Sequence, residues 1–194
     1  MRVLGLSVAV LTIAVSLPAQ TMQQVEGLWK AHRYQDANDA FEALAARNPN
    51  NVDYHVHWGR MLLDRAYFKE AGEQFQKALE MKKDYPPALL GLALGFAGDF
   101  DQRAAQLAKK ALEGDPKLVE AQELLARMAL EDNNNAKAIE EAHKALAIDP
   151  NSVQVKAILA TIDWLADKKE TPWDPHTGKG YETIAYFFVI NRRY

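Results

Sequence analysis

The 194-residue sequence contains no cysteine, which excludes a disulfide framework, a thiolate metal site and a thiol nucleophile. It also has no excess of positive charge, because 23 lysines and arginines stand against 26 acidic residues. A chain with this balance has no general attraction for nucleic acid, so we expect no nucleic-acid partner. Apolar residues make up 48% and charged residues 25%, which predicts a folded chain.

Motifs that carry catalysis or bind metal are missing as well. The five histidines do not form the H-E-x-x-H pattern of zinc hydrolases. His55 and His57 would point to different faces of a helix, and no third ligand lies at a useful spacing. The stretch Gly178-Lys179-Gly180 lacks the residue order of a phosphate-binding loop. We therefore predict no catalytic residue, no metal site and no cofactor.

The N-terminus carries an uncharged apolar run. Arg2 precedes this run, residues 3–15, and the segment from Ser16 to Ala19 then breaks a helix and offers a small residue for cleavage. The run is shorter than the roughly 20 residues that span a bilayer. We predict a signal peptide at 1–19, a secreted or periplasmic product, and no membrane-spanning segment after cleavage. An uncleaved anchor helix is the alternative.

The stretch from residue 104 to residue 150 repeats itself. Small residues and prolines recur 34 positions apart, at Ala104 and Ala138 (138 − 104 = 34), Ala111 and Ala145, and Pro116 and Pro150. This period resembles that of the tetratricopeptide repeat (TPR) family, whose repeats are helix pairs. Small side chains where helices cross let neighbouring pairs approach, and stacked pairs then bury one continuous core.

The resemblance implies an all-α fold, a right-handed superhelical TPR solenoid of antiparallel helix pairs. Four TPR-like repeats are expected at about 20–51, 52–83, 84–118 and 119–152. An additional helix is expected at 153–169, a loop rich in proline and glycine at 170–180, and the first helix of a further, truncated repeat at 181–194.

TPR arrays mainly bind proteins or peptides, so the resemblance implies a non-catalytic, exported interaction scaffold with a protein or peptide partner in its concave groove. The family's groove positions fall on Trp29, Lys30, Arg60, Asp64, Phe96, Arg127 and Glu131. Arg60 and Arg127 could hold a carboxylate, and the two aromatic residues could anchor an apolar group. Alternatively, each arginine pairs with the acidic residue four positions later, and the aromatic residues belong to the core.

The C-terminal part favours a second hypothesis. Trp173-Asp174-Pro175 and the final residues resemble the N-terminal part of larger secreted bacterial TPR proteins, some of which carry a metallopeptidase-like domain. The chain would then be an accessory TPR segment of a larger exported enzyme whose catalytic domain lies beyond residue 194. In either case Ile184, Phe187 and Phe188 are expected to lack a partner helix, which predicts self-association through the C-terminal helix.

Overall fold

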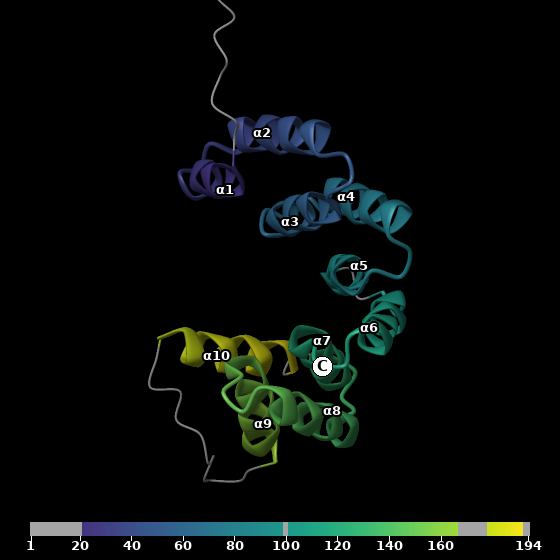
Figure 1. Ribbon diagram of the computed structural model, residues 1–194. Helices are drawn as coiled ribbons and strands as arrows, with labels where there is room; N and C mark the ends of the chain where they lie inside the picture. The colour runs from purple at the N-terminus through teal and green to yellow at the C-terminus, as the bar shows by residue number, and fades with distance from the viewer. Residues whose placement is uncertain (1–20, 99–100, 167–177, 192–194) are drawn as a thin grey trace, which may run out of the picture. The chain divides into compact units, whose positions relative to one another are not determined.

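The computed structural model describes residues 21–98, 101–166 and 178–191 (Figure 1). The predicted signal peptide and most of the predicted 170–180 loop lie outside these residues. The described residues form helices only, with the bounds α1 (Met22–Lys30), α2 (Tyr34–Arg47), α3 (Val52–Leu63), α4 (Phe68–Met81), α5 (Pro86–Gly98), α6 (Arg103–Gly114), α7 (Val119–Glu131), α8 (Asn135–Ile148), α9 (Val153–Leu165) and α10 (Gly178–Asn191). They fall into two compact units, Met1–Leu44 and Ala45–Tyr194.

The first unit contains α1 and most of α2. A capping box begins α1, in which the Thr21 side chain accepts from the backbone N–H of Gln24 and the Gln24 side chain accepts from the backbone N–H of Thr21. The buried apolar side chains of this unit are Val25, Ala37, Ala40, Phe41 and Leu44. Within α2, Ala37 and Phe41 are four residues apart, as are Ala40 and Leu44, which is the spacing of one helix face.

The second unit is built from helix pairs. Three pairs, α3 with α4, α5 with α6 and α7 with α8, pack closely along their lengths (Figure 1). The first helices α3, α5, α7 and α9 also pack against one another in that order, while α4, α6 and α8 each pack against the first helix that follows. The unit therefore has a layer of first helices and a layer of second helices.

Alanines hold the two layers together. The alanines of the 34-residue pattern, Ala104, Ala111, Ala138 and Ala145, have no exposed surface. Each lies on a second helix, where a larger side chain would keep the first helices away. The observed packing thus follows directly from the repeated small residues.

One tight turn recurs between the helices of a pair. Ala66 and Asn133, 67 residues apart (133 − 66 = 67), both have a positive φ, at 58° and 56°. Ala66 N–H donates to Leu63 O at 2.9 Å, and Asn133 N–H donates to Leu130 O at 3.0 Å. The left-handed conformation reverses the chain and satisfies carbonyl groups at the end of the first helix. In the first unit His32 adopts the same conformation, with a φ of 60°.

The C-terminal helix differs from the expectation. We expected Phe187 to lack a partner helix, but its side chain is only 1% exposed and belongs to the cluster formed by α7, α8 and α9. Ile184 packs against the same cluster. The expectation was wrong because α10 packs onto α9 and α7, where burying an aromatic side chain contributes about 1.5–3 kcal/mol. The side chain of Phe188 lies outside the described set.

Candidate functional site

The seven predicted groove residues are divided between the two units. Trp29 and Lys30 lie at the end of α1 in the first unit. The Trp29 side chain is half-buried, and its ring meets the ring of Tyr34 edge-on, with centroids 4.9 Å apart and an interplanar angle of 71°. Lys30 is exposed. Within its own unit, Trp29 therefore packs against a neighbouring aromatic residue and keeps part of its surface open.

Arg60 links two repeats. Its Nη2 donates to both carboxylate oxygens of Glu120, at 2.7 and 2.5 Å, so the ion pair joins α3 to α7. Both helices pack against α5, which lies between them in the first-helix layer. Arg60 thus pairs with a residue 60 positions away and not with Asp64. The two side chains remain 37% and 40% exposed, which limits the stability this pair contributes to about 0.2–1 kcal/mol.

Arg127 forms the pair expected within one helix. Its Nε lies 3.7 Å from Oε1 of Glu131, four residues later, and this Nε is buried without a hydrogen-bond partner among the described residues. The Glu131 side chain is only 12% exposed. Burial raises the pKa of the Glu131 carboxyl, while the charge of Arg127 opposes that rise.

A polar cleft of about 200 Å³ lies beside these charges. It is lined by residues of α5, α7 and α9, namely Leu94, Glu120, Glu123, Leu124, Arg127, Gln154 and Ile158. The lining residue Glu123 is held by Ser152, whose Oγ donates to Glu123 Oε1 at 2.5 Å and accepts from the backbone N–H of Val155 at 3.1 Å. Burial raises the pKa of the Glu123 carboxyl, and the hydrogen bond from Ser152 opposes that rise.

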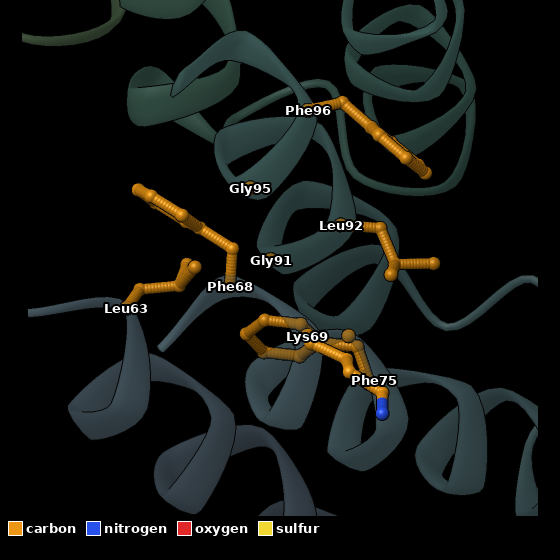
Figure 2. A pocket seen from close by; sticks show the side chains of 9 residues that line it. Leu63, Phe68, Lys69, Phe75, Gly91, Leu92, Gly95 and Phe96 are labelled. Carbon is orange, nitrogen blue, oxygen red and sulfur yellow. The ribbon is translucent and has the colours of Figure 1, made fainter. Parts of the chain in front are cut away.

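A second cavity, which we call the apolar pocket, has a volume of about 330 Å³ and is lined by residues of α3, α4 and α5. Its lining residues are Leu63, Phe68, Lys69, Gly72, Phe75, Gly91, Leu92, Gly95 and Phe96. Figure 2 shows Gly91 and Gly95 on α5, with Leu63 and Phe68 to one side and Leu92 and Phe96 to the other. Lys69 is the one charged residue in this lining.

Glycine has two different roles here. A Cβ at Gly91 would lie 2.2 Å from Cε1 of Phe75, and one at Gly59 would lie 2.6 Å from the same atom, so these glycines accommodate the buried Phe75 ring. A Cβ at Gly95 would meet only Leu63 Cδ2, at 3.6 Å, and one at Gly72 would meet nothing within 4 Å. Glycine inside a helix costs roughly 0.5–1 kcal/mol relative to alanine, and packing does not explain that cost at 72 and 95.

One of the seven predicted groove residues lies at this pocket. Phe96 was expected at a ligand-facing position, and it lines the apolar pocket. Sequence reasoning did not find Phe68, Gly72 or Gly95. The available signal was the presence of glycines inside the predicted helices around residues 72 and 95, which the 34-residue pattern does not require.

The described part of the chain lacks a metal site and a membrane-spanning helix. Among residues 21–98, 101–166 and 178–191, no three His, Cys, Asp or Glu side chains lie close enough together to hold a metal ion. No helix in the described part of the chain is long and apolar enough to cross a membrane.

Solved structures with the same arrangement of helices are found at low sequence identity. MamA is 17% identical, with a TM-score of 0.62 over 89% of this chain and 95% of MamA. PilF of Pseudomonas aeruginosa is 16% identical, with a TM-score of 0.64 over 88% of this chain and 73% of PilF. YrrB, a TPR protein, is 13% identical, with a TM-score of 0.55 over 89% of this chain and 85% of YrrB. These similarities support an all-α TPR solenoid.

The sequence itself also matches a known family. The model of the tetratricopeptide repeat matches residues 22–86 and 89–153, which together make up more than half of the chain. The matched ranges contain α1 to α4 and α6 to α8 in full, and α5 except for residues 87 and 88. The chain therefore belongs to the tetratricopeptide repeat family.

Proposed function

We propose that the chain is a non-catalytic scaffold that binds a protein or peptide partner, and that the apolar pocket receives one apolar side chain of that partner. The observation that carries this proposal is the pair Gly72 and Gly95, which leave the pocket open although neither is needed for packing. Membership of a family that binds proteins and peptides supports it. The TPR protein YrrB has an unusual peptide-binding site.

The size and charge of the pocket define the ligand further. At about 330 Å³ it lies at the small end of ligand sites, so it fits one large side chain better than a whole small molecule. The Lys69 side chain is exposed and forms no hydrogen bond or ion pair with the described residues, so its ammonium group is available to an incoming carboxylate. We therefore expect an aromatic or long aliphatic side chain followed or preceded by an acidic residue.

A displayed library of random peptides, selected against the full chain, tests this proposal. Gly95→Leu fills the pocket. Gly27→Leu is the matched control, because a Cβ at Gly27 meets nothing within 4 Å and this glycine lies in the other unit. We expect enriched peptides with an apolar residue beside an acidic one, which bind wild type and Gly27→Leu but bind Gly95→Leu at least tenfold more weakly. Equal binding to all three proteins would contradict the assignment of the pocket.

We also propose that the chain is exported. Arg2, the apolar segment 3–15 and the small residue Ala19 support this proposal. N-terminal sequencing of the product from its native host should find a mature chain that begins near Gln20. A product that retains Met1 and stays in the cytoplasm would contradict it.

Self-association through the C-terminal helix stays a prediction. Because Phe187 is buried, the association would have to use the other apolar side chains of α10. Tyr186 and Val189 of α10 are 51% and 52% exposed, whereas Phe187 is buried. Two exposed apolar side chains form a small patch, so we expect weak association that appears only at high concentration. Light scattering across a concentration series measures it.

A further inference from the structure

The inner positions of α7 are covered to an unusual degree. Leu130 and Glu131 occupy the positions in α7 that Leu63 and Asp64 occupy in α3, 67 residues earlier (130 − 63 = 67). Leu63 is only partly buried and Asp64 is exposed, whereas Leu130 is fully buried and the Glu131 side chain is 12% exposed. Both helices are followed by another first helix, but that helix has Gly91 and Gly95 after α3 and Ile158 and Ile162 after α7, so it accounts for part of the difference.

The helix α10 adds to the cover of α7. A second helix of this unit, such as α6, packs against its own first helix α5 and against the next one, α7. In contrast, α10 packs against α9 and back against α7, which are successive first helices (Figure 1). The Phe187 side chain is 1% exposed and shares a cluster with Leu130, Ile158 and Ile162 from these two helices. The helix α10 therefore lies on the first-helix layer.

We propose that α10 is a tethered ligand of the first-helix layer, and that the surface beneath it binds amphipathic helices that carry an aromatic anchor in place of Phe187. The part of this proposal that concerns an external partner rests on the proposed function above. The seat of Phe187, by which we mean the cluster residues that surround its side chain, is apolar. An external helix must displace α10. Its apparent association constant is therefore the intrinsic constant multiplied by the fraction of molecules in which α10 has left this surface.

Variants of the full chain test whether the buried Phe187 side chain holds α10 against α7 and α9, and whether a charge added elsewhere on α10 has the same effect. Phe187→Glu places a charge in the buried seat, where it has no paired cation, and should release α10. Val189→Glu adds the same charge to a position of the same helix that is 52% exposed, so it should leave α10 in place. Hydrogen exchange of α10 should be fast in Phe187→Glu and as slow in Val189→Glu as in wild type. Phe187→Ala, which removes the anchor without adding charge, guards against a folding defect and should give an intermediate result.

The decisive measurement adds the helix back as a separate molecule. A fluorescent peptide with the sequence of residues 178–191 is titrated into each full chain, and its anisotropy reports binding. We expect the peptide to bind Phe187→Glu at least tenfold more tightly than it binds wild type or Val189→Glu, because only there is the seat free. The same peptide carrying Phe187→Glu should not bind.

Equal affinity for all the chains would overturn the proposal, and so would a released α10 whose seat does not bind the peptide. Continued protection of α10 in Phe187→Glu would also overturn it, since Phe187 would then not be the anchor. The experiment uses no external partner and does not involve Gly95. Its failure is therefore distinguishable from failure of the apolar-pocket proposal.

Discussion

At the scale of single residues, the two roles of glycine lead to opposite expectations. Gly91→Ala places a Cβ 2.2 Å from the buried Phe75 ring, so it should lower the free energy of unfolding by about 1–3 kcal/mol through overpacking. Gly72→Ala meets no atom within 4 Å and should raise it by about 0.5–1 kcal/mol through helix propensity. Urea denaturation measures both. Shifts of the same sign would show that the packing described around Phe75 is wrong.

The recurring left-handed turn predicts a reciprocal pair of substitutions. Ala66 has a φ of 58°, a conformation that asparagine tolerates better than alanine does. Ala66→Asn should therefore raise the free energy of unfolding by about 0.5 kcal/mol. Asn133→Ala should lower it by a similar amount, because Asn133 occupies the equivalent position with a φ of 56°. Thermal melts of the two variants and of the double variant test whether the effects are opposite and additive.

The buried Glu123 carboxyl predicts a pH dependence. Its pKa in the folded chain is raised above the ordinary 4.5, mainly by burial, so the folded state binds this proton more readily than the unfolded state does. The resulting stability is fully present below pH 4.5 and is lost as pH rises through the raised pKa. Glu123→Gln keeps an oxygen that can accept from Ser152 and removes the charge.

We therefore expect Glu123→Gln to gain stability relative to wild type as pH rises above 4.5. The control is Glu140→Gln, because the hydrogen bond from Lys144 lowers the pKa of the exposed Glu140 carboxyl. The free energy of unfolding of Glu140→Gln should therefore fall relative to wild type as pH rises, which is the opposite direction to Glu123→Gln. Denaturant melts at several pH values decide, and a pH-independent difference for Glu123→Gln would contradict the burial of this carboxyl.

At the scale of helices, sequence periodicity predicted the elements but not all of their neighbours. The 34-residue spacing of alanines predicted the helix pairs, because those alanines are required wherever two helices cross closely. The packing of α10 could not be predicted in this way. The apolar spacing of Ile184 and Phe187 shows that the helix has a buried face, but it does not say which helices cover that face.

The same limit applies to the candidate site. Arg127 and Glu131 are four residues apart, so a helix alone brings them together. Arg60 and Glu120 are 60 residues apart, and only the stacking of three first helices brings them into contact. The apolar pocket likewise needs side chains from three helices around a glycine backbone, which no single stretch of sequence reveals.

A double-mutant cycle tests the stacking of the first helices. Arg60→Ala, Glu120→Ala and the double variant should give a coupling energy of about 0.2–1 kcal/mol, because both side chains are more than a third exposed. Arg60→Ala combined with Asp64→Ala is the comparison, and its coupling should be close to zero. A larger coupling with Asp64 than with Glu120 would mean that α3 and α7 are not in the register described.

At the scale of the whole molecule, the central claim is that the second unit binds a peptide side chain between α4 and α5. Hydrogen exchange of the full chain, with and without a saturating peptide from the library selection, tests this most directly. We predict added protection confined to residues 68–72 and 91–96, and none in the Gly95→Leu variant at the same peptide concentration. Protection that falls elsewhere, or that persists in Gly95→Leu, would contradict the claim.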